Sequence, residues 1–73
     1  MSMINIYKNM HPKVRHRFSS ILLDAALIHK AGHGDWRTYV RVGRNRSVGR
    51  LRKILQTVLD YTDEEFEFFV SKI

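Results

Sequence analysis

Apolar side chains recur every three or four residues between positions 12 and 31, which is the period of one face of an α-helix. Pro12 suits the first position of such a helix, because the N–H that proline lacks would have no partner there. Gly32 suits its end, and His29 and Lys30 place positive charge near the negative end of the helix dipole. The pattern predicts a long helix over residues 12–31, with an apolar face of Val14, Phe18, Ile21, Leu22, Ala25, Ala26 and His29.

The same spacing predicts two shorter helices in the C-terminal third. We expect Ser47 to cap a helix that runs from Val48 to about Asp60. Thr62 followed by Glu65 forms a capping box, which predicts a last helix beginning there. The first apolar stripe comprises Val48, Leu51, Ile54, Leu55, Val58, Leu59 and Tyr61, and the second comprises Phe66, Phe69, Val70 and Ile73, with Phe68 outside it.

Between the long helix and these two, the pattern changes to an alternation with period two. One face would carry Trp36, Thr38, Val40 and Val42, and the other would carry Arg37, Tyr39 and Arg41. This predicts a half-buried strand from Trp36 to Val42 that ends at Gly43. The apolar opening at residues 3–7 predicts a second strand or an N-terminal arm within residues 1–10. The expected fold is mainly α: a small single domain over residues 1–73, with about three helices and one or two short β-strands.

Composition narrows the possible chemistry. The 73 residues include no cysteine, so disulfides and thiolate metal sites are excluded. His29 and His33 have the spacing of a helical zinc site, but Gly32 is expected to end the helix between them. No nucleophile with an oriented base stands out, so we expect neither a catalytic residue, a metal nor a cofactor. No signal peptide or membrane-spanning run is visible, which favours a soluble, cytoplasmic protein.

Charge is distributed unevenly along the chain. Residues 1–53 carry twelve Lys and Arg against two acids, a formal charge of +10, whereas residues 54–73 carry one Lys against five acids, a formal charge of −4. Together these give the net charge of +6. The protein therefore combines a basic body with an acidic C-terminal segment, and this asymmetry says more about partners than the total does.

Positive charge is concentrated in RVGRNRSVGRLRK, residues 41–53, which holds six cations, five of them arginines. Arginine is suited to forked contacts with phosphate or carboxylate groups. Positive charge at the start of a helix also opposes the helix dipole, so fold stability alone would not favour it. With the outward face of the predicted strand, the candidate partner-binding residues are Arg37, Tyr39, Arg41, Arg44, Arg46, Arg50 and Lys53.

The order strand, helix, helix is that of ribbon-helix-helix DNA-binding repressors, in which strand residues read bases in the major groove. Arg37, Tyr39 and Arg41 would be the readers. The final helix, however, begins Thr62-Asp63-Glu64-Glu65, and these three acids would repel the phosphate that such proteins place there. A less specific contact between the basic residues and RNA or DNA is a second interpretation.

A third interpretation is a small regulator that docks on a larger charged assembly. In length, basicity and lack of catalytic residues, the chain resembles the small basic transcription regulators of the Xanthomonas phage type, which bind host RNA polymerase. The resemblance implies a site in the N-terminal region of the polymerase β′ subunit, near the RNA exit channel, in the host cytoplasm. It also implies inhibition of initiation through loss of the sigma factor, together with antitermination. RVGRNRSVGR and HPKVRHRFSSILLDAALIHK would be the contacting segments.

Overall fold

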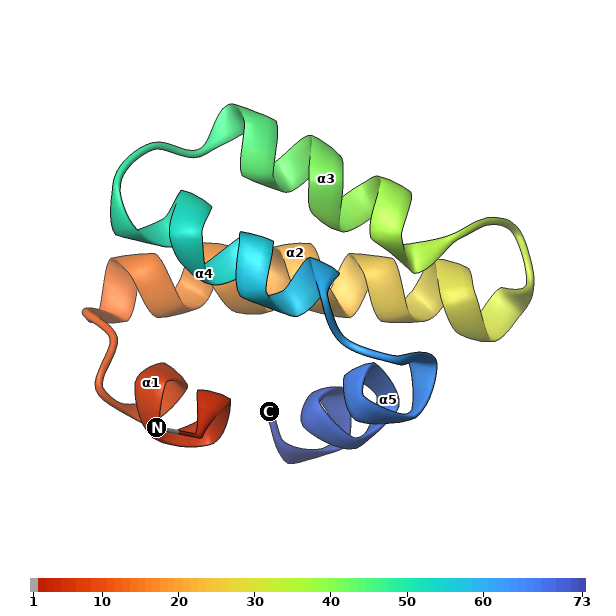
Figure 1. Ribbon diagram of the computed structural model, residues 1–73, viewed down its shortest axis with the longest axis horizontal. Helices are drawn as coiled ribbons and strands as arrows, with labels where there is room; N and C mark the ends of the chain where they lie inside the picture. Colours follow the sequence, from red (N-terminus) through yellow and green to blue (C-terminus); the bar gives the residue numbers. More distant parts are fainter. Residues whose placement is uncertain (1) are drawn as a thin grey trace.

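The computed structural model describes residues 2–73, which form five helices (Figure 1). The helices are α1 (Met3–Lys8), α2 (Pro12–Ala31), α3 (Trp36–Arg46), α4 (Arg50–Leu59) and α5 (Asp63–Lys72). In Figure 1, α2 runs along the length of the molecule, with α3 on one side of it and α1 and α5 on the other, while α4 packs against α3 and α2. The mainly α class is confirmed, but residues 2–73 contain no strand.

The long helix α2 has the bounds that the sequence predicts. Pro12 occupies its first position, and the His11 ring before it accepts a hydrogen bond from the Lys13 N–H at 3.2 Å. Gly32 ends the helix in the left-handed conformation, with φ of 72°, which glycine adopts without steric cost. Phe18, Leu22 and Ala25 are fully buried, so the predicted apolar face does form the core side of the helix.

The prediction of a strand at residues 36–42 is wrong, because this segment belongs to α3. Asp35 caps the helix, since its carboxylate accepts the Arg37 N–H at 3.2 Å. Trp36, Val40 and Gly43 are the buried residues, and their spacing of four and three is helical. Val42, which the alternation places on the core side, is instead 46% exposed.

Gly43 lies inside α3 and does not end it, as the strand prediction required. A Cβ atom at this position would lie 2.8 Å from Cγ2 and 2.9 Å from Cδ1 of Ile21. Such distances are shorter than carbon atoms tolerate, so a side chain here would force Ile21 or the backbone to move. The missing side chain therefore allows α3 to approach α2 closely.

The expectation that Ser47 caps the following helix is also wrong. Ser47 is the C-cap of α3 and is buried, and its hydroxyl donates to the Gly43 carbonyl oxygen at 2.8 Å. The next helix, α4, begins at Arg50 after Gly49, whose φ is 66°. Val48 thus lies in the turn, 81% exposed, rather than on the apolar stripe. The remainder of the stripe is confirmed at Leu51, Ile54, Leu55 and Val58, which are all buried.

The first residues form a short helix instead of the expected arm or strand. The Ser2 hydroxyl accepts the Asn5 N–H at 3.3 Å and so caps α1. Met3 is buried, and Tyr7 lies against the aromatic rings of Phe18 and Phe69 with centroids 6.0 and 6.3 Å apart. These contacts attach the N-terminal segment to α2 and α5.

The capping box that the sequence predicts at the start of α5 is confirmed. The Thr62 hydroxyl accepts the Glu65 N–H at 3.1 Å, and the Glu65 carboxylate accepts the Thr62 N–H at 3.0 Å. Phe66 and Phe69 are buried, as the stripe predicts, whereas Phe68, which lies outside the stripe, is 61% exposed. Within residues 2–73, no helix has the length and apolar character needed to cross a membrane.

Candidate functional site

Arg37, one of the predicted contact residues, makes several contacts within the molecule, and 30% of its side chain remains exposed. Its guanidinium donates to the Asp63 carboxylate at 3.0 Å and to the Tyr61 carbonyl oxygen at 2.7 Å. It also lies over the Trp36 ring, 4.3 Å from the centroid. Arg37 therefore fastens the start of α3 to the start of α5 through charge-assisted hydrogen bonds.

Asp63 is the acceptor at the centre of this junction. It receives the Trp36 indole N–H at 2.9 Å in addition to the guanidinium of Arg37. The hydrogen bonds from Trp36 and then from Arg37 lower the pKa of Asp63 below its usual value, because they favour the charged carboxylate. Trp36 itself is fully buried and stacks on Phe66, with ring centroids 4.0 Å apart and planes at 5°.

Tyr39 and Arg41 do not share one outward face with Arg37. On a helix, Arg41 follows Arg37 by four residues and lies on the same side, whereas Tyr39 points to the other side. Tyr39 faces α2 and is 41% exposed, and Arg41 is exposed. The three side chains therefore cannot act together as base readers on a strand, and the ribbon-helix-helix interpretation loses its structural basis.

Near the turn between α3 and α4, two hollows are bordered by Arg17, Arg44, Arg46, Arg52 and Lys53. The first, the α2/α3 groove, has a volume of about 440 Å³. Its floor is partly apolar, with Ile21, Val42 and Gly43, and its polar lining includes Arg17, Ser20, Asp24, Tyr39, Arg46 and Ser47. The groove thus combines apolar surface with a cation from each of the two helices.

The second hollow, the α3/α4 hollow, has a volume of about 560 Å³ and is lined by Arg44, Gly49, Arg52, Lys53 and Gln56. This lining contains three cations and no acid. The Nε atom of Arg44 is buried, and within residues 2–73 it has no hydrogen-bond partner. A buried donor of this kind is costly without an acceptor.

The cations around this turn form no ion pair within residues 2–73, and Asp24 is the acid that lines the α2/α3 groove beside Arg17 and Arg46. The ion pairs found within residues 2–73 join His29 to Glu67 and Arg37 to Asp35 and Asp63. We use the term basic face for the cations of residues 41–53 together with Arg17 of α2; because Arg44 and Arg46 border different hollows, this surface extends over both sides of α3. The basic face comprises Arg17, Arg41, Arg44, Arg46, Arg50, Arg52 and Lys53.

The positions of these cations relative to the helix ends determine whether each one opposes the helix dipole. Arg44 and Arg46 lie in the last turn of α3, where positive charge is favourable. Arg50, Arg52 and Lys53 lie in the first turn of α4, where it is unfavourable. Only these three side chains therefore oppose the local helix dipole.

Sequence reasoning missed two members of the basic face. Arg52 lies in the same cationic run and lines the α3/α4 hollow, but it is not among the predicted contact residues. Arg17 lies within the α2 segment that the resemblance implies as a contact, and it lines the α2/α3 groove with Arg46 where Gly43 allows α3 to approach α2. No signal in the sequence pairs Arg17 with Arg46.

The histidine pair with zinc spacing is separated as expected. His29 lies in the last turn of α2, and its Nε2 atom is 3.0 Å from the Glu67 carboxylate, while His33 follows Gly32 outside the helix. Residues 2–73 contain no group of three His, Cys, Asp or Glu side chains placed to hold a metal ion.

No family model, no curated protein and no solved structure matches the chain.

Proposed function

We propose that this protein is a non-enzymatic regulator of the phage type that binds host bacterial RNA polymerase through its basic face. One observation carries the proposal. The cations around the α3–α4 turn form no ion pair within residues 2–73, although other residues of the same chain are acidic. An arginine cluster without ion pairs stabilises a fold poorly, but it supplies forked donors for a partner's carboxylates.

The target within the polymerase follows from the resemblance of the chain to small phage regulators. We infer a contact with the N-terminal region of the β′ subunit, near the RNA exit channel. The expected effects are inhibited initiation and antitermination. The apolar floor of the α2/α3 groove supports a protein partner over a purely phosphate-bearing one, because Ile21 and Val42 offer nothing to a phosphate.

The test is binding of the full chain to purified bacterial core polymerase, together with transcription in vitro. A triple variant, Arg46→Ala, Arg50→Ala and Arg52→Ala, removes three exposed cations of the basic face. A matched control, Lys8→Ala, Lys13→Ala and Lys30→Ala, removes the same charge from exposed positions elsewhere. We expect the first variant to lose polymerase binding and the control to retain it. If both variants lost polymerase binding equally, binding would depend on net charge and not on the basic face. Failure of the unaltered chain to bind polymerase would refute the proposal.

The second candidate function is contact of the same face with RNA or DNA. The α3/α4 hollow favours it, since three cations without an acid suit a phosphate. If five phosphates were neutralised on duplex DNA, the logarithm of the binding constant should fall with the logarithm of salt concentration with a slope of roughly −4 to −5. A gel shift with duplex DNA and with RNA at moderate salt distinguishes the two candidates.

A further inference from the structure

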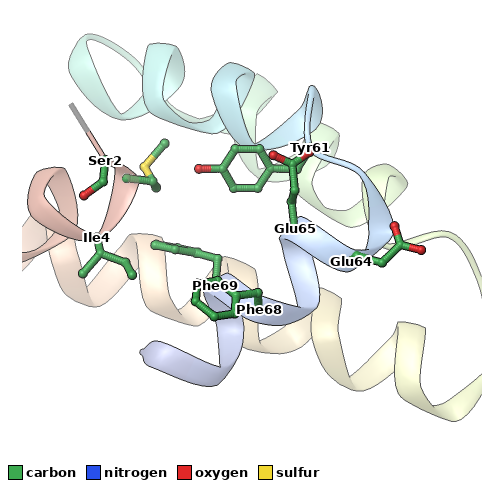
Figure 2. A pocket seen from close by; sticks show the side chains of 8 residues that line it. Ser2, Ile4, Tyr61, Glu64, Glu65, Phe68 and Phe69 are labelled. Atoms are coloured by element: carbon green, nitrogen blue, oxygen red, sulfur yellow. The ribbon is translucent and has the colours of Figure 1, made fainter.

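A hollow of opposite character lies between α1 and α5. This hollow, the α1/α5 cleft, has a volume of about 370 Å³ (Figure 2). Its apolar lining includes Met3, Ile4, Phe68 and Phe69, and its acidic rim consists of Glu64 and Glu65. None of these residues belongs to the basic face, so the cleft is a separate surface.

Phe68 is the feature of the cleft that folding does not explain. Its side chain is 61% exposed, while Phe66 and Phe69 on the same helix are buried. Leaving most of a phenyl ring in water forgoes the hydrophobic stabilisation that its burial would provide. Lys72 lies over this ring, with its Nζ atom 5.3 Å from the centroid, which is an intrachain example of a cation–π contact.

The rim of the cleft carries two carboxylates, those of Glu64 and Glu65. Within residues 2–73, Glu64 has no ion pair, and Glu65 uses one oxygen to accept the Thr62 N–H. Tyr61 projects across the cleft toward Ser2, with Glu65 beside it (Figure 2). Burial and then the nearby charge of Glu65 raise the pKa of Tyr61, as expected where a second negative charge is unfavourable.

These features select among possible occupants. The carboxylates would repel nucleic acid, anionic lipid and acidic peptides. A wholly apolar segment would desolvate the carboxylates without replacing their hydrogen bonds. The occupant should therefore pair with the carboxylates and also cover the apolar lining. An arginine or lysine does both, because its charged end pairs with a carboxylate while its aliphatic stem covers the phenyl ring.

A second copy of this chain suits the cleft less well than a different protein. A symmetric dimer through the cleft would place the acidic rims of the two copies against each other. A head-to-tail contact between the cleft and the basic face would not form a two-fold dimer but a ring or an open chain of several copies, which would appear as concentration-dependent self-association.

We propose that the α1/α5 cleft binds a segment of another protein that presents an arginine or lysine beside aliphatic side chains. This site acts independently of the basic face and of the proposed polymerase contact, so the protein has two interaction surfaces of opposite charge.

The test is NMR titration of the ¹⁵N-labelled full chain with the capped peptide Ac-Leu-Arg-Leu-Arg-Leu-NH₂. Its matched control is the peptide with both arginines replaced by glutamate. We expect saturable shifts of the Ile4, Glu64 and Phe68 amides with the first peptide and none with the second. Equal binding of the two peptides, or shifts confined to the basic face, would overturn the proposal.

Variants locate the contact within the cleft. Phe68→Ala should weaken peptide binding roughly three- to tenfold, through loss of one cation–π contact and of the apolar area beneath the arginine stem. Glu64→Gln should weaken it roughly two- to fivefold, as for one exposed ion pair.

Two further variants control for indirect effects. Lys72→Ala keeps the phenyl ring and should not weaken binding, so a loss like that of Phe68→Ala would contradict the proposal. Arg52→Ala, on the basic face, should leave peptide affinity unchanged within about twofold, which is the size of an ordinary surface effect. Cleft shifts that appear on concentrating the protein without peptide would point to self-association and would also overturn the proposal.

Discussion

The two ends of α3 carry the same type of side chain into opposite surroundings. At the N-terminal end, Arg37 finds Asp63, the Tyr61 carbonyl group and the Trp36 ring, and all of its contacts lie within the molecule. At the C-terminal end, Arg44 and Arg46 border hollows without an ion pair in residues 2–73. An arginine-rich sequence thus shows where positive charge lies along the chain. Whether an arginine stabilises the fold or can bind a partner depends on whether the fold places an acceptor beside it.

The largest effect should come from the junction at the start of α3. Trp36→Ala removes a fully buried ring that stacks on Phe66, so it should lower the free energy of unfolding by about 3–5 kcal/mol. Val42→Ala, at a 46% exposed position near the other end, should change it by about 0.5 kcal/mol or less. Urea unfolding followed by circular dichroism measures both. Similar losses would remove the distinction between the two ends.

A smaller effect should appear in the pH dependence of the same junction. Because the pKa of Asp63 is lowered in the folded state, its contribution is fully present above the unfolded pKa of about 3.9. That contribution is lost as the pH falls through the lower, folded pKa. Asp63→Asn should therefore reduce Tm at neutral pH, and the difference from the unaltered protein should narrow on acidification. Asp60→Asn, which alters an exposed carboxyl at the end of α4, is the control and should not show this narrowing.

The smallest effect should have the opposite sign. Arg50→Glu places a negative charge in the first turn of α4, where the helix dipole favours it, so stability should rise by about 0.3–1 kcal/mol at low salt. Arg41→Glu makes the same change of charge in the middle of α3 and should lack this gain. If Arg50→Glu stabilises the fold and also reduces polymerase binding, the arginine is present for contact. A destabilised Arg50→Glu would show that the basic face supports the fold after all.

The helices that could be predicted are those whose ends carry their own chemistry. Pro12 and Gly32 bound α2, and Thr62 with Glu65 starts α5, so local signals were sufficient in both cases. The segment of α3 fits two periods, since Trp36 and Val40 lie on one face in a helix and also in a strand. The choice between helix and strand depends on the rest of the molecule. A lone strand leaves its backbone N–H and C=O groups without partners, whereas a helix pairs them within itself.

The site was less predictable than the fold, for a reason of distance along the chain. The charge of the segment at residues 41–53 could be read directly, and most of the basic face lies there. The engagement of Arg37 depends on Asp63, which is 26 residues away, and the inclusion of Arg17 depends on the close approach at Gly43. Local spacing in the sequence indicates neither relation. Only the folded structure therefore distinguishes Arg37, which is paired within the molecule, from the arginines of the basic face.

The position of the chain ends has a practical consequence for constructing fusions. Both ends lie on the α1 and α5 side of α2, and Ser2 itself lines the α1/α5 cleft (Figure 1). An affinity tag or a fluorescent fusion at the N-terminus would crowd that cleft and leave the basic face open. A reporter at the N-terminus would thus detect binding at the basic face while blocking the α1/α5 cleft. A dye attached to the exposed turn through Val48→Cys would instead detect binding at the cleft while crowding the basic face. Comparing binding with the two labels therefore distinguishes the two surfaces without substituting the central residues of either one.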